Sequence, residues 1–165
     1  MKALKQTTPN NTKLKSHNPD QTREFGYQVG EGLNPGDLIL LVGGLGTGKT
    51  CFTQGLALAL GVEDYVTSPS YVLIKEYQGK HRLHHIDFYR LTDSEEITDL
   101  GIDEYLQNGG ICVIEWADRS MAALPEQYLL IQFDYLPGDQ RLLQFESKGT
   151  RFDRILPGLI LKWNS

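Results

Sequence analysis

The sequence is poor in cysteine and has no long apolar run. Cys51 and Cys112 are its only cysteines, and neither belongs to a CxxC pair or another metal-ligand spacing. No apolar run approaches the roughly 18 residues that a membrane-spanning helix requires. The N-terminal residues lack the apolar middle of a signal peptide, so we expect no membrane association and a cytoplasmic location.

Positive charge is also in short supply. The chain of 165 residues has a formal net charge of −5 and a pI near 5.3. A protein that grips nucleic acid through its own surface needs clustered Lys and Arg to neutralise phosphates. We therefore expect no binding to DNA, and we expect any RNA to be held through a partner protein.

The distribution of apolar residues divides the chain into a tail and one domain. Residues 1–19 are polar and carry lysines and prolines but almost nothing to bury, which predicts a flexible tail. Residues 20–165 contain the apolar patterns. A single domain of this size buries about 70% of the surface that its unfolded chain exposes, enough for a proper core.

The first part of this domain predicts a helix, a strand, a loop and a second helix. Apolar residues recur every four positions over 20–33, behind cap candidates at Asp20 and Thr22, as in an amphipathic helix. Residues 38–43, LILLVG, form the short apolar run of a strand that is covered on both faces. Residues 49–61 follow a glycine-rich loop and predict the second helix.

The remaining strands are predicted to include two hairpins. Residues 71–77 and 81–90 flank the turn QGK, and residues 127–135 and 141–147 flank LPGDQ. Residues 109–116 have the composition of another buried strand. The central sheet is therefore expected to be mixed and partly antiparallel.

Two later segments have helical features. Residues 93–107 begin with Asp93 and Ser94 followed by two glutamates, a pattern that favours the start of a helix. The C-terminal segment 151–163 is ambiguous because Pro157 would interrupt a helix.

The glycine-rich loop matches the phosphate-binding motif G-x-x-x-x-G-K-[ST] in full and lies between a predicted strand and a predicted helix. Its glycines let backbone N–H groups converge on phosphate oxygens. Lys49 would bring positive charge to the β- and γ-phosphates, and the Thr50 hydroxyl would ligate Mg²⁺. The candidate nucleotide-binding residues are Gly43, Leu45, Gly46, Thr47, Gly48, Lys49 and Thr50. We predict an α/β, three-layer P-loop NTPase fold in which residues 20–165 form one nucleotide-binding domain.

Two acidic residues at strand ends are candidates for the chemistry. Glu115 ends the apolar run ICVIE, which is where a nucleotide–Mg²⁺ site needs a carboxylate. Asp87 ends another predicted strand and, with Lys49, is a candidate catalytic residue. Many P-loop ATPases carry a water-activating acid directly after the metal acid, but here Trp116 follows Glu115. Asp87, or else Asp118, would have to orient the water, so we expect slow hydrolysis unless a partner completes the site.

Three neighbouring histidines raise the alternative of a metal site. Alternation along a strand would put His81 and His85 on one face and His84 on the other. No set of ligands with the spacing of a zinc site is formed. We therefore favour Mg²⁺ at Thr50 and Glu115 over a histidine-bound metal.

Together these motifs resemble one family over residues 22–151. The chain is similar to the TsaE family, small bacterial ATPases of tRNA threonylcarbamoyladenosine biosynthesis. The motifs that carry the resemblance are LGTGKT with Phe52 and Gly55, SPSY at 68–71, HIDFYRL at 85–91, the pair Glu95 and Glu96, LGIDEYL at 100–106, and VIEW at 113–116.

The resemblance implies a protein that binds ATP with Mg²⁺ and works with two partners, TsaB and TsaD. Those partners transfer a threonylcarbamoyl group to an adenosine beside the tRNA anticodon, so tRNA would be contacted through the partner complex. The resemblance also implies that Thr22 touches the nucleotide, that Thr50 and Glu115 hold Mg²⁺, and that Asp87 is the aspartate of the HxDxYR-like motif.

Two positions depart from the family pattern. The family commonly has Asp after the first loop glycine and Thr after GKT, whereas this chain has Gly44 and Cys51. The first change removes a carboxylate beside the loop, which bears on nucleotide affinity or turnover more than on the fold. The second replaces a hydroxyl near the phosphates by a thiol, while Thr50 itself is retained.

A P-loop small-molecule kinase is the alternative function. Such kinases close a lid that carries arginines over the transferred phosphate. Here Arg82, Arg90 and Arg119 are scattered between the loop and the second hairpin, so the accessory ATPase is the preferred hypothesis.

Overall fold

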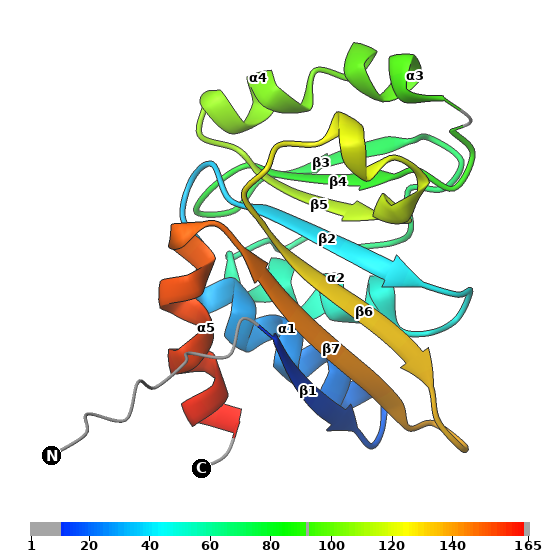
Figure 1. Cartoon of the computed structure of the whole chain (residues 1–165), viewed down its shortest axis with the longest axis vertical. Coiled ribbons are helices and arrows are strands. Elements are labelled where there is room, and N and C mark those ends of the chain that lie inside the picture. The colour runs from blue at the N-terminus through cyan, green and yellow to red at the C-terminus, as the bar shows by residue number, and fades with distance from the viewer. Residues whose placement is uncertain (1–10, 92, 164–165) are drawn as a thin grey trace, which may run out of the picture.

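The computed structural model describes residues 11–91 and 93–163. These residues form one seven-stranded sheet with helices on both faces, a three-layer α/β arrangement (Figure 1). This confirms the predicted fold class. No helix within the described ranges has the length and apolar character that a membrane span needs.

The sheet is mixed, as the two hairpins predicted. Its strands are β1 (Asn11–Ser16), β2 (Leu38–Gly43), β3 (Ile74–Tyr77), β4 (Leu83–Asp87), β5 (Ile111–Glu115), β6 (Tyr128–Tyr135) and β7 (Arg141–Lys148). They lie in the order β1-β7-β6-β2-β5-β4-β3. The neighbours β6–β2, β2–β5 and β5–β4 are parallel, and the outer pairs are antiparallel. The parallel centre therefore brings the carboxyl ends of β2, β4 and β5 to one edge.

The helices divide between the two faces of the sheet. They are α1 (Pro19–Glu31), α2 (Lys49–Ala59), α3 (Ser94–Asp99), α4 (Ile102–Gln107) and α5 (Thr150–Trp163), with 3₁₀ turns η1 (Ala117–Arg119) and η2 (Met121–Ala123). Helices α1, α2 and α5 share one apolar cluster with the sheet. Helices α3 and α4 share a second cluster on the opposite face.

Alternation along β2 shows why this strand is apolar throughout. Ile39 and Leu41 belong to the cluster under α1, α2 and α5, whereas Leu38 and Leu40 belong to the cluster under α3 and α4. All four side chains are buried. A strand covered on both faces needs apolar residues at successive positions, which is the pattern read in LILLVG.

Helices α1 and α2 pack so closely that glycine is required at their contact. A Cβ on Gly55 would lie 1.9 Å from the carbonyl oxygen of Arg23, and a Cβ on Gly26 would lie 2.0 Å from that of Phe52. Neither distance is compatible with a side chain unless the helices separate. The contact therefore holds the start of α1 beside the start of α2, where the glycine-rich loop ends.

The predicted flexible tail over residues 1–19 is wrong for its second half. Residues 11–16 form β1, which pairs with β7 at the edge of the sheet (Figure 1). An edge strand gains main-chain hydrogen bonds without many apolar side chains, so its polar composition was misleading. Residues 1–10 lie outside the described residues.

The start of α1 also differs from the prediction. Its N-cap is Asn18, whose side chain accepts a hydrogen bond from the backbone of Gln21, and Pro19 begins the helix. Asp20 and Thr22 lie inside the helix instead. Asparagine at the cap followed by proline is a strong local start signal, and it outweighs the later polar residues.

The structure differs from the sequence-based expectation in two helical segments. Residues 93–107 form two short helices because Gly101, with φ of 75°, interrupts the chain between α3 and α4. Asp93 caps α3 as predicted. At the C-terminus α5 continues through Pro157. Burial of Phe152, Leu156 and Leu159 against the sheet compensates for the hydrogen bond that proline cannot make.

The two predicted hairpins are confirmed, and the first has shorter strands than predicted. The strand β3 begins at Ile74, and β4 begins at Leu83, so His81 lies in the connection and not on the face of a strand. His84 and His85 do lie on opposite faces of β4. His84 packs towards α4, and His85 points to the face that α2 covers.

Candidate functional site

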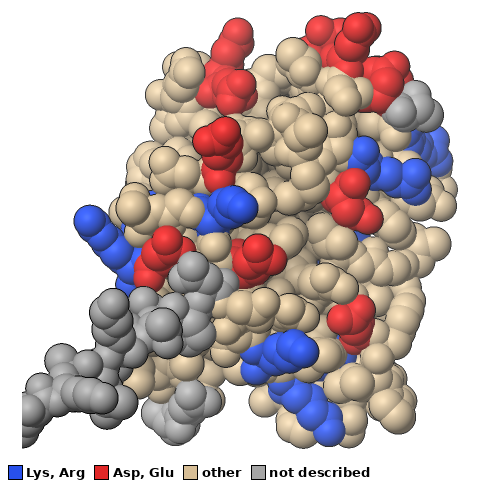
Figure 2. Space-filling view, viewed as in Figure 1, with Lys and Arg blue, Asp and Glu red and all other residues tan. Residues whose placement is uncertain are grey.

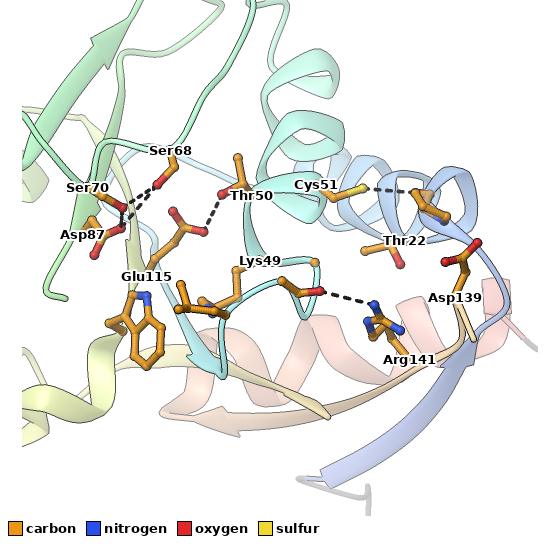
Figure 3. A pocket seen from close by; sticks show the side chains of 15 residues that line it. Thr22, Lys49, Thr50, Cys51, Ser68, Ser70, Asp87, Glu115, Asp139 and Arg141 are labelled. Carbon is orange, nitrogen blue, oxygen red and sulfur yellow. Dashed lines mark hydrogen bonds between the residues drawn. The ribbon is translucent and has the colours of Figure 1, made fainter. Parts of the chain in front are cut away.

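The glycine-rich loop connects β2 to α2 at the edge where the parallel strands end (Figure 3). Gly46 and Gly48 have φ of 70° and 105°, and Gly48 is the N-cap of α2. Residues with a side chain rarely adopt this backbone region, so the glycines allow the loop to wrap around a space at the helix N-terminus. That space is suited to an anion because unpaired N–H groups and the positive end of the helix dipole meet there.

Lys49 lies across this loop. Its Nζ donates hydrogen bonds to the carbonyl oxygens of Gly43 and Gly44, both at 2.7 Å, and it lies 4.4 Å from the centre of the Trp116 ring. Burial lowers the pKa of Lys49, an effect opposed by the negative charges of Glu115, Asp87 and Asp118. The ammonium group is therefore held at the loop by neutral oxygens and a π face, contacts that a phosphate could replace.

Glu115 is held by two partners at the end of β5. Its Oε1 accepts a hydrogen bond from the Thr50 hydroxyl at 2.9 Å, and its Oε2 lies 3.0 Å from Nε2 of His85. Glu115 is buried, with 2% of its surface exposed. The register of the parallel strands pairs Glu115 with Asp87, so the two acids lie side by side at the same edge.

Asp87 is fixed by the segment that precedes β3. Its Oδ2 accepts a hydrogen bond from Ser70 at 2.8 Å, with Ser68 at 3.5 Å, and its Oδ1 accepts one from the backbone N–H of Tyr89 at 2.7 Å. A carboxylate offers about four lone-pair positions. The contacts made by the described residues thus leave Asp87 with capacity to accept a hydrogen bond from a further group, such as a water molecule.

These elements surround a cavity of about 390 Å³. Such a volume is in the usual range for small-molecule sites. The predicted site residues that line it are Thr22, Leu45, Gly46, Gly48, Lys49, Thr50, Asp87 and Glu115. Thr22 comes from α1, where its hydroxyl bonds to Ser16 of β1 at 2.7 Å. The ends of β4 and β5, the loop, α1 and the start of α2 thus contribute to one space (Figure 3).

Two predicted residues shape the loop without lining the cavity. The Thr47 side chain turns back to donate to the Gly44 carbonyl at 2.8 Å. A Cβ on Gly43 would lie 2.6 Å from the carbonyl oxygen of Phe133 on the neighbouring strand β6. Gly43 therefore permits the loop to leave the sheet close to β6, and Thr47 stabilises its turn.

The two departures from the family pattern have different surroundings. A Cβ on Gly44 would have the Tyr135 ring at 3.5 Å, which is ordinary contact, so a side chain would fit there. The Cys51 thiol donates to the Pro19 carbonyl at 3.2 Å, and burial raises its pKa. Cys51 thus links the first turn of α2 to the start of α1.

The sequence-based prediction missed part of the cavity wall. The β6–β7 hairpin contributes Asp139 and Arg141, and Arg141 Nη2 lies 3.3 Å from the Gly46 carbonyl. Ser68, Ser70 and Trp116 also line the space. No local pattern marks Arg141, because it reaches the loop only through the pairing of β7 beyond β6.

The arginines considered for a kinase lid lie elsewhere. Arg82, Arg90 and Arg119 do not line the cavity, and within the described ranges its only arginine is Arg141. Arg90 lies over the ring of Tyr71, and Arg119 lies near Tyr89 and Trp116. The cavity therefore lacks the arginine-rich cover on which the kinase alternative depended.

The donor atoms beside the loop fit a hard divalent cation. Thr50 and Glu115 supply a hydroxyl and a carboxylate in contact with each other, both oxygen ligands of the type that Mg²⁺ prefers. Among residues 11–91 and 93–163, no group of three or more His, Cys, Asp or Glu is arranged to hold a metal. Mg²⁺ in nucleotide sites takes few protein ligands because phosphate oxygens and water complete its shell.

Comparisons with known proteins agree on one family. Residues 16–143 match the family model described as threonylcarbamoyl adenosine biosynthesis protein TsaE. A Bacillus subtilis protein named tRNA threonylcarbamoyladenosine biosynthesis protein TsaE is 38% identical over 144 residues, which are 87% of this chain and 90% of that protein. A Treponema pallidum protein of the same name is 40% identical over 126 residues, 76% of this chain and 93% of its own length.

A solved structure shares the fold. The crystal structure of YdiB from Bacillus subtilis superposes with a TM-score of 0.80 at 33% sequence identity. The match covers 92% of this chain and 95% of that one. The similarity therefore extends over the whole arrangement of loop, sheet and helices and is not confined to the phosphate-binding motif.

Proposed function

The chain belongs to the TsaE family, and from that premise we propose that it is a Mg²⁺-dependent ATP-binding protein with slow, partner-stimulated ATPase activity, acting in the threonylcarbamoyladenosine modification of tRNA. The observation that carries the proposal is the convergence of the loop, Glu115 and Asp87 on one cavity. The related proteins named above carry tRNA threonylcarbamoyladenosine biosynthesis in their names.

Nucleotide binding is assigned to the loop. Phosphates of ATP would take the N–H groups at the start of α2, and Lys49 would exchange its two carbonyl contacts for phosphate oxygens. Thr50 and Glu115 would hold Mg²⁺, which supplies neutralisation of phosphate charge when bound. Thr22 and Arg141 line the same space and would contact the rest of the nucleotide.

Slow hydrolysis follows from the residue after Glu115. Trp116, with φ of 59°, occupies the place where a second acid would orient water, and its ring lies against Lys49. Asp87 would take over this role, since it lines the cavity and retains acceptor capacity. One carboxylate bound to Ser70 is an incomplete hydrolytic set, so a partner that stabilises the transition-state charge would raise turnover.

The partners are assigned as TsaB- and TsaD-like proteins, and tRNA would be reached through them. Figure 2 shows acidic side chains at the top and scattered over one face of the molecule, while Lys and Arg form only small groups, at its right and lower edges. The net charge of −5 gives no general attraction to phosphates. This role would place the protein in the cytoplasm with the tRNA pool.

Reconstituted tRNA modification tests the function. Purified TsaB, TsaD, substrate tRNA and the reagents for threonylcarbamoyl transfer are incubated with and without this chain, and modified adenosine is counted. We expect sustained modification only when the chain and ATP are both present. Equal modification without the chain would contradict the proposed role.

The nucleotide assignment is tested separately with Lys49→Ala. Loss of the loop's side-chain cation should weaken ATP binding, because a charge-assisted contact to phosphate is lost while the backbone cradle remains. Calorimetric titration measures the affinity, and thermal melting of the same sample shows whether the variant is folded. A folded variant with wild-type affinity would remove the phosphate-loop assignment.

Partner stimulation is tested with Asp87→Ala. Steady-state ATPase rates are measured for wild type and variant, each with and without the TsaB–TsaD pair. The pair should raise the wild-type rate, and the variant should lose most of that rise while still binding ATP. An unstimulated wild type would refute completion by the partner, and a fully stimulated variant would remove Asp87 from the mechanism.

A further inference from the structure

His85 is a buried polar residue that the proposed chemistry has not used. It lies at the centre of β4 with 0% of its surface exposed. The side chains around it on this face of the sheet include Leu83 and Val113, which belong to the apolar cluster under α2. A polar ring in such a place is costly unless it is hydrogen-bonded, so its partner indicates its role.

That partner is the carboxylate assigned to Mg²⁺. Nε2 of His85 lies 3.0 Å from Glu115 Oε2, while Thr50 donates to the other oxygen, Oε1, at 2.9 Å. Each oxygen of the Glu115 carboxylate therefore has its own hydrogen-bond partner. With both contacts made, rotation of the carboxylate about its last bond would break at least one of them.

The surroundings of the second ring nitrogen decide which nitrogen carries the proton. Nδ1 of His85 is buried and has no hydrogen-bond partner among the described residues. A proton on Nδ1 would leave a buried donor without an acceptor and would turn the lone pair of Nε2 towards the carboxylate. A proton on Nε2 makes a favourable N–H···O⁻ bond instead.

The neighbouring histidine provides a contrast. His84 is also buried, but it stacks on Tyr105 with ring centres 4.2 Å apart, and its Nδ1 lies 3.3 Å from Glu76. It packs on the opposite face of the sheet and does not line the cavity. Two adjacent histidines of one strand thus differ in whether they touch the site.

We propose that His85 is a positioning residue that donates its Nε2–H to Glu115 and so holds the carboxylate ready for the metal. The proposal rests on the proposed Mg²⁺–nucleotide function. Ligand-holding hydrogen bonds of this kind typically change metal affinity by about 10- to 100-fold when they are removed. The role is therefore visible in metal binding and does not require turnover.

The test measures how much Mg²⁺ improves nucleotide binding. A non-hydrolysable ATP analogue is titrated calorimetrically into the full chain with Mg²⁺ and with EDTA, and the ratio of the two Kd values gives the metal-dependent gain. His85→Leu should lower this gain about 10-fold or more, with the Kd in EDTA unchanged. His85→Gln, which keeps an N–H donor near the position of Nε2, should restore most of the gain.

Two reference variants separate the possible failures. His84→Leu removes the buried histidine on the other face and should leave the gain at its wild-type value. Glu115→Gln should lose the gain. If Glu115→Gln keeps it, the metal assignment in the proposed function fails, and the role of His85 falls with it. If Glu115→Gln loses it while folded His85→Leu keeps it, the role of His85 alone is overturned.

The wild-type protein offers a test that survives a folding failure of His85→Leu. In protein labelled with ¹⁵N at histidine, long-range proton–nitrogen NMR spectra distinguish the two ring nitrogens of each imidazole. Signals of His85 are identified by comparison with His85→Gln and His84→Leu. We expect a proton on Nε2 of His85; an unprotonated Nε2 would overturn the proposal.

Discussion

The two helical layers of this protein differ in how firmly they are attached to the sheet. On one face α1, α2 and α5 are long helices; α1 and α2 meet at contacts that only glycine permits, and Arg151 at the start of α5 pairs with the buried carboxylate of Asp37. On the other face α3 and α4 have six residues each and pack through a few apolar side chains. The first layer positions the glycine-rich loop and Thr22, so its packing tolerates little change. The second layer mainly covers the sheet.

The largest effect on stability is expected from Gly55→Ala, a substitution in the first layer. The added methyl would lie 1.9 Å from the Arg23 carbonyl oxygen. The helices would have to separate, and we expect the free energy of unfolding to fall by more than about 3 kcal/mol, at the upper end of overpacking costs. Urea denaturation followed by circular dichroism measures it.

The matched control is Gly158→Ala in α5. A Cβ there meets no atom within 4 Å. Alanine is the better helix former, so stability should be unchanged or higher by up to about 1 kcal/mol. Equal stability of Gly55→Ala and wild type would show that the α1–α2 contact is looser than the structure indicates.

The second substitution expected to weaken the first layer is Arg151→Met. Arg151 lies at the start of α5, and its guanidinium donates to Asp37 at 2.8 and 3.1 Å and to the Gly32 carbonyl at 2.9 Å. Its removal leaves the buried carboxylate of Asp37 without its cation. We expect a loss of about 2–3 kcal/mol, below the usual cost of breaking a fully buried pair because Arg151 is partly exposed.

The control for the Arg151–Asp37 pair is an ion pair at the surface. Asp20→Asn breaks the contact between Asp20 and Arg23, which lies at the surface. Surface ion pairs contribute little, so the unfolding free energy should change by less than about 0.5 kcal/mol. Denaturation of Arg151→Met and Asp20→Asn at the same ionic strength compares their unfolding free energies. Similar losses of stability in the two variants would contradict the prediction.

In the second layer, His84 should make the stability of the protein depend on pH. Burial lowers the pKa of His84, while the charge of Glu76 raises it and that of Arg82 lowers it further. As the pH falls through about 6.5, this histidine takes up a proton in the unfolded chain but stays neutral in the folded chain. Stability from this group is present above about pH 6.5 and is lost as pH falls towards the lowered pKa, by up to about 1.4 kcal/mol per pH unit.

His84→Leu measures that contribution. Unfolding free energies are compared at several pH values between about 7.5 and 5, where histidine protonation changes. The variant should lose less stability on acidification than wild type. If His84→Leu has the wild-type pH profile, burial of His84 does not govern this dependence.

The smallest effect is expected from Asp93→Ala in the same layer. The Asp93 side chain caps α3 by accepting a hydrogen bond from the backbone of Glu96 at 2.9 Å. Its loss should cost about 1 kcal/mol. The control Asp103→Ala removes an acid from the first turn of α4 that is not the cap, and should cost only a few tenths of a kcal/mol. Thermal melting of both resolves the difference.

Parts of the candidate site were predictable because their signals are local. The loop motif, the apolar strand before it and the acids Asp87 and Glu115 at strand ends can all be read along the chain. Parallel strands bring their carboxyl ends to one edge, so acids at the ends of neighbouring strands lie close together. The register that pairs Asp87 with Glu115 shows this meeting directly.

Other parts depend on contacts between distant segments. Residues 11–16 carry no apolar pattern, yet they form β1 because β7 offers an unpaired edge. The α5 helix runs through Pro157 because its apolar side is buried on the sheet. In each case packing or pairing with another element outweighed the local preference.

The amino-acid sequence by itself determined the glycine-rich loop, the strands buried on both faces and the acids that follow them, since each depends on neighbouring residues and backbone geometry. Only the tertiary structure decided that Arg141 and Asp139 enter the cavity and that His85 holds Glu115. These side chains meet across separate strands, and the meeting depends on strand order and register. Those are set by the packing of the whole chain and leave no mark in a short stretch of sequence.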